Sequence, residues 1–146
     1  MHYLCFALID AEGDPKALVD ALMAPHDETT REEGGFFDWF QMGGRWTGYL
    51  DGYDPKKDPA NLRPDGRPEW PTSWVGHDGD VQPVEVARAR CAADDGLPHT
   101  LVGGGEPLFK SAWDGSDFVD TPDFEAKVRA RLAAHTGRVA IVDYHS

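Results

Sequence analysis

The two ends of the chain are its most apolar segments, and both have the pattern of buried β-strands. Residues 2–9 (HYLCFALI) carry apolar side chains at odd and even positions alike, which is typical of a strand covered on both faces. Residues 138–145 (RVAIVDYH) form the last predicted strand. A further strand is predicted at 99–102, and after a glycine turn an irregular strand follows at 106–113, so these two segments are expected to form a hairpin.

Three segments have the spacing of amphipathic helices. The first follows Asp14, a favourable N-cap residue, and ends at Pro25. The second lies within 83–93, where apolar side chains keep helical spacing. The third has Thr121 as its expected N-cap and ends at Gly137, with an apolar residue at every fourth position.

The region between the first two predicted helices is rich in aromatic residues and turn formers. A glycine pair indicates a turn before residues 45–50, which are predicted to form a strand. Residues 51–80 are rich in Pro, Gly and charged residues, a composition that disfavours regular structure. Because Trp70 and Trp74 also lie there, we expect a loop packed on the body of the protein and not a free linker. Residues 1–146 are therefore predicted to form a single domain.

This mixture of strands and helices predicts an α+β fold. We expect one mostly antiparallel sheet with two or three helices on one face, and a ferredoxin-like arrangement is favoured. In that topology the first and last strands are antiparallel neighbours at the centre of the sheet. His2 is then expected to face Asp143 and His145.

Charge narrows the classes of partner. The chain has 26 acidic and 14 basic residues, a formal net charge of −12, and the acidic residues are spread along its whole length. Such a field repels nucleic-acid backbones and anionic membranes, so neither is expected as a direct partner. The negative charge favours solubility. It also leaves open a second function, that of an acidic inhibitor that mimics DNA and binds a nucleic-acid enzyme. No apolar run is long enough to span a bilayer, and a cytoplasmic protein is expected.

The first candidate site lies in DWFQMGGRWTG, residues 38–48. The arginine fork matches a phosphate or carboxylate in two hydrogen bonds, glycines leave backbone N–H groups uncovered, and the nearby rings offer a stacking surface for a base. The alternative is structural: a glycine turn in which Arg45 stacks on a tryptophan and pairs with Asp38 or another acid. Neither a P-loop nor a dinucleotide fingerprint surrounds this segment. The residues assigned to the site are Trp39, Gly43, Gly44, Arg45 and Trp46.

The second candidate site combines His2, Asp143 and His145. Residues two apart on a strand point to the same face, so this carboxylate and the imidazoles are candidates for a metal site or an acid–base pair in a metal-assisted hydrolase. The alternative is that the histidines near the chain ends are exposed or structurally hydrogen-bonded. The segment 77–80 (HDGD) is interpreted as a solvated turn. No GxSxG, HExxH or deaminase motif is present, and the sequence leaves the cofactor unknown.

Several of these segments resemble a group of small uncharacterised proteins encoded by actinobacteria and their phages. The most specific pieces are WFQMGGRW at 39–46 and VDYH at 142–145, and the similarity of arrangement covers most of the chain. The resemblance implies a phage or prophage accessory role and a cysteine between the final Asp and His, where this chain has Tyr144. We expect a binding protein for an anionic small molecule such as a nucleotide, and whether it is an enzyme stays open.

Overall fold

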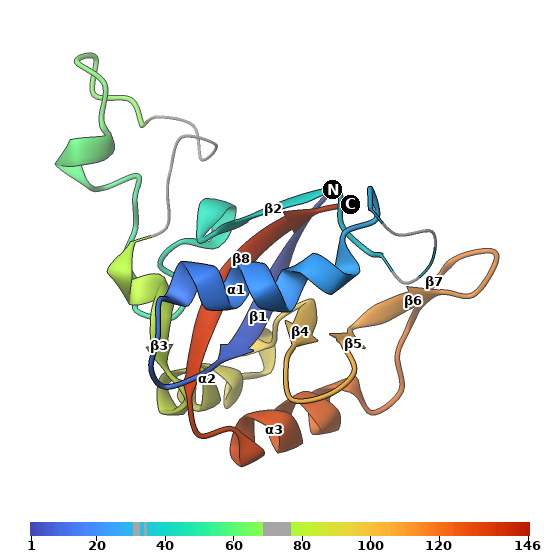
Figure 1. Ribbon diagram of the computed structural model, residues 1–146. Helices are drawn as coiled ribbons and strands as arrows, with labels where there is room; N and C mark the ends of the chain where they lie inside the picture. Colours follow the sequence, from blue (N-terminus) through green and yellow to red (C-terminus); the bar gives the residue numbers. More distant parts are fainter. Residues whose placement is uncertain (31–32, 34, 69–76) are drawn as a thin grey trace.

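A computed structural model describes residues 1–30, 33, 35–68 and 77–146. Its central feature is the pairing of the two apolar ends of the chain, β1 (His2–Ile9) and β8 (Arg138–His145). They run antiparallel over their whole length, from His2 opposite His145 to Ile9 opposite Arg138. Both strands lie inside the sheet, as Figure 1 shows, so the prediction that the first and last strands are central neighbours is confirmed.

Shorter strands extend the sheet on both sides of this pair. On the β1 side, β4 (Thr100–Val102) runs parallel to β1 and is paired in turn with the antiparallel β5 (Leu108–Phe109). On the β8 side, β2 (Trp39–Met42) and β3 (Val81–Pro83) both pair antiparallel with β8 and occupy different parts of the same edge. The sheet is thus mixed but mostly antiparallel.

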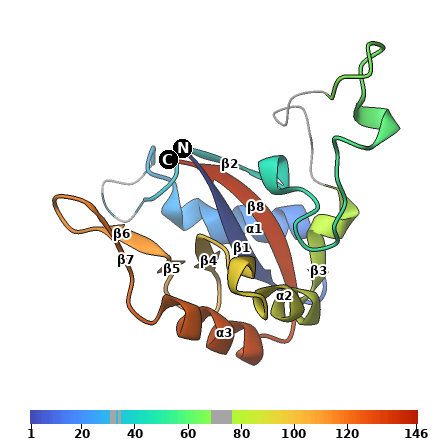
Figure 2. The ribbon, with the colours of Figure 1, turned by 180° about the vertical axis from the view of Figure 1, so that it is seen from behind.

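Helices cover both faces of this sheet. In Figure 1 α1 (Pro15–Met23) crosses the front, and Figure 2 shows α2 (Val84–Cys91) and α3 (Phe124–Ala134) from the opposite side. Alternate residues of β1 divide accordingly: Cys5, Ala7 and Ile9 share one buried cluster with α1, and Leu4, Phe6 and Leu8 share the other with α2 and α3.

The expectation of helices on one face is therefore wrong, and the ferredoxin-like arrangement is not confirmed. The physical reason is visible in the two longest strands, β1 and β8, whose side chains are apolar on both faces. In β1 each residue from Leu4 to Ile9 is only 0% to 6% exposed. Two apolar faces need two covering layers. The α+β class and the three helices are as predicted.

Several local expectations need correction. Residues 45–50 do not form a strand, because the strand of this region, β2, ends before the glycines and a 3₁₀ turn, η2 (Gly44–Trp46), follows. The predicted strand at 106–113 is divided: its first part is β5, and its last part is β6 (Ser111–Trp113), which pairs with β7 (Phe118–Asp120) in a separate two-stranded sheet. The third helix begins after Asp123, not after Thr121.

Residues 51–68 extend away from the sheet in Figure 1 and include the short 3₁₀ helix η3 (Pro59–Asn61) among several turns. The chain returns to the sheet at η5 (Asp78–Asp80) and β3. Trp70 and Trp74 lie outside the described residues, so their packing stays a prediction. Two other 3₁₀ helices among the described residues are η1 (Ala24–His26) and η6 (Asp94–Gly96).

Both cysteines are buried free thiols, and burial raises the pKa of Cys91 to about 11. Among the described helices, none combines the length and apolar character that a membrane span requires.

Candidate functional site

A buried carboxylate lies at the centre of the region that the sequence singled out. Asp143 lies in β8 between β1 and β2, and 0% of it is exposed. Its two oxygens have different partners: the Nδ1–H of His2 donates to Oδ1 (2.9 Å), and the backbone N–H of Arg45 donates to Oδ2 (3.0 Å). One carboxylate therefore links the second residue of the chain, the last strand and the glycine turn.

The glycine pair lets the turn approach this carboxylate. Gly43 and Gly44 have positive φ angles of 70° and 56°, a region that favours glycine. A Cβ atom on Gly44 would lie 2.5 Å from Oδ2 of Asp143. The N–H of Gly43 donates to the carbonyl of Ile141 (2.9 Å), so this donor holds the turn on β8. The glycines thus serve the geometry of the turn, and the Gly43 N–H is already engaged within the protein.

Beside Asp143, three rings contact one another. The ring centroids of His2 and His145 are 5.4 Å apart, those of His2 and Trp39 are 5.2 Å apart, and Trp39 stacks on His145 at 5.8 Å. These residues share one face because His2, His145 and Trp39 lie opposite one another on three neighbouring strands. Trp39 and His145 remain partly exposed at the surface.

His145 has its own carboxylate partner. Its Nδ1–H donates to Oδ1 of Asp38 at 2.9 Å, and this hydrogen bond lowers the pKa of Asp38. The two imidazoles therefore have the same arrangement: an aspartate accepts the Nδ1–H, and no described residue forms a hydrogen bond with Nε2. One aspartate is buried and the other is at the surface.

The side chain of Arg45 is exposed, and within the described part of the chain its guanidinium has no hydrogen bond, ion pair or ring contact. Asp38, the partner considered for it from the sequence, is engaged by His145 instead. Trp46 lies elsewhere than Trp39: its ring packs beside His99 at 5.6 Å and against the core. The structure thus brings Trp39, His2, His145 and Asp143 together, and the backbone N–H of Arg45 joins them through Asp143, whereas Trp46 packs against the core.

This cluster offers few donor atoms to a metal ion. Asp143 has hydrogen bonds at both oxygens, which leaves the two imidazoles as the groups available to an ion. Among the described residues, no group of three or more His, Cys, Asp or Glu side chains is arranged to hold a metal ion. The arrangement resembles an oriented pair of imidazoles more than a preformed metal site.

Position 144 points away from this cluster. Tyr144 packs on the α1 side of the sheet, its hydroxyl lies 2.7 Å from the Thr100 hydroxyl, and burial raises its pKa. A cysteine here, which the resemblance implies, would face α1 and not Asp143 or His145.

Comparisons of the chain with protein-family models, with curated proteins and with solved structures find no significant match.

A second buried carboxylate was missed by the interpretation of HDGD as a solvated turn. Asp80 is 1% exposed. It accepts hydrogen bonds from the Thr47 hydroxyl (2.6 Å), the Gly48 N–H (2.7 Å) and the His77 N–H (3.0 Å). These contacts join the two ends of the segment 51–80. The sequence contained a signal for this buried carboxylate: His77 and Asp80 have the spacing of a capping box at the start of η5.

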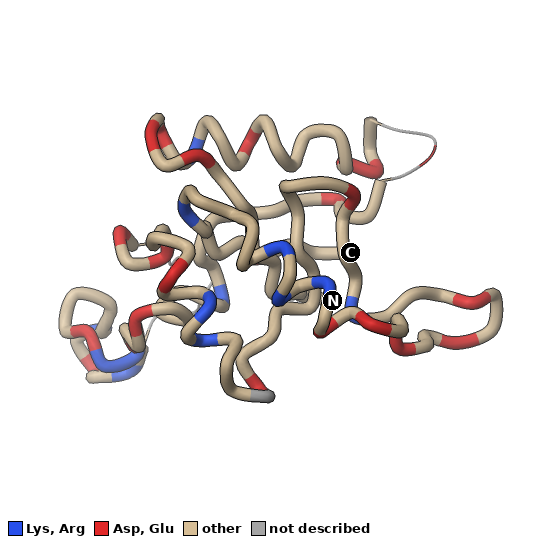
Figure 3. Tube along the Cα trace, turned by 90° about the horizontal axis from the view of Figure 1, so that it is seen from below, with Lys and Arg blue, Asp and Glu red and all other residues tan. Residues whose placement is uncertain are grey.

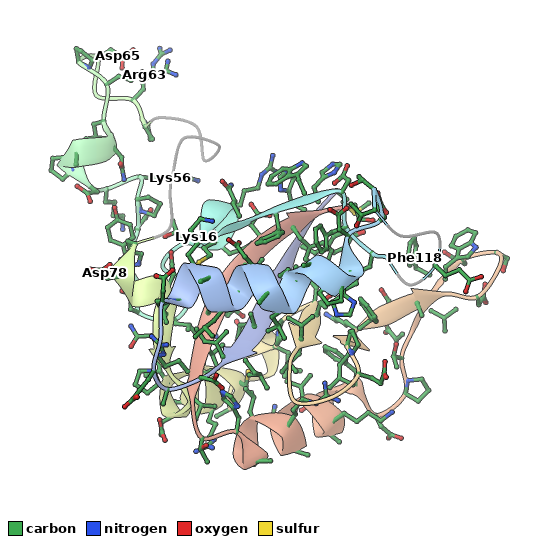
Figure 4. The ribbon with its side chains drawn as sticks, viewed as in Figure 1. Lys16, Lys56, Arg63, Asp65, Asp78 and Phe118 are labelled. Atoms are coloured by element: carbon green, nitrogen blue, oxygen red, sulfur yellow. The ribbon has the colours of Figure 1, made fainter. Side chains whose placement is uncertain are left out.

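A cavity of about 660 Å³ lies between the start of α1, β2 and η5, and Arg45 does not line it. Figure 4 shows Lys16 and Asp78, two of its lining residues, at the N-terminal end of α1 and on η5. Its acidic lining groups are offset by Lys16, which pairs with Asp20 at 2.8 Å, and by Arg138. Mixed charge of this kind indicates no particular ligand.

Proposed function

We propose that the protein binds an anionic small molecule, such as a nucleotide, at the surface formed by Arg45, Trp39, His2 and His145. The observation that carries the proposal is the exposed guanidinium of Arg45, which has no partner among the described residues. Among the described residues the side chain of Arg67 has no partner either, and Arg45 differs from it in that Asp143 fixes its backbone N–H. The phage or prophage context stays a prediction from the resemblance.

The neighbouring groups suit such a ligand. A guanidinium binds phosphate through two parallel hydrogen bonds. The ring of Trp39 is partly exposed and stacks on His145 with one face, so its other face is offered to a base. Each imidazole has its Nδ1–H engaged by an aspartate.

The position of the site limits its affinity. Arg45 lies on the open surface and not in the cavity beside α1. Ligand sites that bury most of a ligand are concave, so a surface site of this kind is expected to bind with modest affinity. A phosphate alone should bind more weakly than a nucleotide, because it does not use Trp39.

Thermal unfolding with adenosine monophosphate and with inorganic phosphate tests the proposal. At a ligand concentration of about ten times Kd, binding stabilises the folded state by about 1.4 kcal/mol, a rise in Tm of roughly 3–6 °C. Arg45→Ala should remove this rise and leave the Tm without ligand unchanged, because its side chain has no described contacts. Arg67→Ala, at another exposed arginine, is the matched control. An Arg45→Ala variant that unfolds, or that keeps the ligand-induced rise, contradicts the proposal.

The His2–Asp143 contact favours a second candidate function, hydrolysis. A carboxylate that holds the Nδ1–H of an imidazole leaves Nε2 free to accept a proton from an attacking water molecule. In the metal-assisted alternative the Nε2 atoms of His2 and His145 would hold the ion, and His2 would then not act as the base. Elemental analysis of untagged protein, with thermal unfolding in zinc or manganese, tests the metal: it should stabilise the wild type and not His2→Ala. If neither ion binds and no ester is cleaved, this candidate is removed.

A further inference from the structure

The hairpin β6–β7 exposes large apolar side chains outside the two cores. Trp113, Phe118 and Val119 are 59%, 61% and 49% exposed, respectively. Figure 1 shows this hairpin projecting from the side of the sheet beyond β5, and Figure 4 shows Phe118 near its outer part. Neither buried cluster includes these three side chains. Exposed aromatic residues that lie next to one another are typical of interaction surfaces.

The hairpin holds these rings in a defined arrangement. Trp113 lies directly opposite Phe118, and their ring centroids are 5.4 Å apart in an edge-to-face contact. The turn between them is closed by Asp114, whose Oδ1 accepts hydrogen bonds from the N–H groups of Ser116 (2.8 Å) and Asp117 (2.9 Å). These hydrogen bonds lower the pKa of Asp114. A cross-strand aromatic pair stabilises the hairpin, and both residues nevertheless remain exposed to a partner.

The charge around the rings selects the partner. Residues 111–126 contain acidic side chains at 114, 117, 120, 123 and 125 and no Lys or Arg. Figure 3 shows acidic positions and no basic ones along the projecting hairpin. A partner must therefore offer positive charge around an apolar surface. A second copy of this chain, with a net charge of −12, does not meet this requirement.

We propose that the β6–β7 hairpin docks on a protein whose basic side chains surround an apolar stripe or groove. Trp113 and Phe118 enter the apolar part, and Asp117 and Asp120 contact the surrounding Lys and Arg side chains. Aromatic anchors of this kind contribute most of the binding energy at interfaces, and rim charges mainly raise the association rate. This docking surface is separate from the anion site at Arg45 and does not depend on it.

A fluorescently labelled model peptide provides the probe. We suggest a peptide of about 18 residues that forms an amphipathic helix with Leu on one face and Lys on the other. Polylysine of equal charge and a Leu/Glu peptide of equal apolar content are the comparison probes. Anisotropy titration should show binding of the Leu/Lys peptide, at least tenfold weaker binding of polylysine and no binding of the Leu/Glu peptide. The absence of Leu/Lys binding overturns the proposal.

Variants locate the binding site. Trp113→Ala with Phe118→Ala should weaken Leu/Lys binding at least tenfold, whereas Leu62→Ala, at an exposed apolar residue elsewhere, should leave it unchanged. Because the double variant removes the cross-strand pair, Asp120→Lys is a second test that leaves both rings in place. It should weaken binding severalfold at low salt. Equal affinity of the wild type and these variants overturns the proposal, as does a wild-type dimer in sedimentation that the double variant dissociates.

Discussion

The Nδ1 atom of His2 lies 2.9 Å from Oδ1 of Asp143, although 141 positions separate the two residues in the sequence. The full-length pairing of β1 with β8 produces this contact, because His2 lies opposite His145 and thus diagonally adjacent to Asp143. The same carboxylate accepts the N–H of Arg45. The position of the proposed anion-binding arginine therefore depends on an internal hydrogen-bond network.

Removing the buried carboxylate is expected to destabilise the protein strongly. Asp143→Ala leaves the donors of His2 and Arg45 without an acceptor, at a cost of about 2–4 kcal/mol. Asp38→Ala is the matched control, because Asp38 contacts His145 at the same distance of 2.9 Å but at the surface. Urea unfolding should show a large loss for Asp143→Ala and a much smaller one for Asp38→Ala. Equal losses would contradict the role of burial.

Gly44 tests the approach of the turn to Asp143. Gly44→Ala introduces both an unfavourable positive φ and a Cβ atom 2.5 Å from Oδ2 of Asp143. Gly52→Ala shares the positive φ, but its Cβ would meet no atom within 4 Å. The free energy of unfolding of the control should fall by about 1 kcal/mol. That of Gly44→Ala should fall by roughly 1–3 kcal/mol more because of the clash. If denaturant unfolding gives equal losses, the close approach is not present in solution.

Asp80 is predicted to fix the ends of the segment 51–80. Asp80→Ala removes the acceptor of Thr47, Gly48 and His77 and should cost about 2–4 kcal/mol. The neighbouring Asp78→Ala, at an exposed residue, should change stability little. Limited proteolysis should cut the segment faster in the Asp80 variant. Unchanged cleavage in that variant would show that other contacts hold the segment.

His99 is expected to contribute a pH dependence to stability. Burial, together with the charge of Lys110, lowers its pKa, and its Nδ1 accepts the N–H of Leu4 at 3.0 Å, which requires the neutral ring. The unfolded state binds this proton first, so the stability that the neutral ring provides is lost as the pH falls below about 6.5. His99→Asn, whose Oδ1 can accept the same N–H without titrating, should lose less stability than the wild type when the pH is lowered from about 7.5 to about 5. Parallel urea midpoints of the two proteins would refute this role.

The sequence predicted the elements with strong local signals. Asp14 caps α1 through a hydrogen bond to the Ala17 N–H, Pro15 occupies the first helical position, and the apolar character of the two end strands correctly indicated a central pair. The proximity of His2, Asp143 and His145 followed from that pairing and is confirmed. These features depend on short-range patterns or on one strand pair.

Other features depended on tertiary packing that local patterns do not encode. Coverage of both sheet faces was indicated by the apolar character of both faces of β1, a signal that the one-face prediction did not use. Residues 45–50 turn because Gly44 must fit against Asp143. Trp113 was predicted only as the end of an irregular strand at 106–113, and no element was predicted at Phe118, so their exposed pairing was not anticipated. Asp80 resembled a surface residue, because its burial depends on donors 32 and 33 positions away.

The side-chain Nε–H resonance of Arg45 gives the most direct test of the anion site. In nitrogen–proton NMR spectra, titration with adenosine monophosphate should shift this resonance progressively while that of Arg67 stays in place, and phosphate should shift it at higher concentrations. The indole resonance of Trp39 should move with the nucleotide and not with phosphate. If the Arg45 resonance remains fixed at saturating concentrations of both anions, this side chain does not hold an anion and the proposed function is wrong.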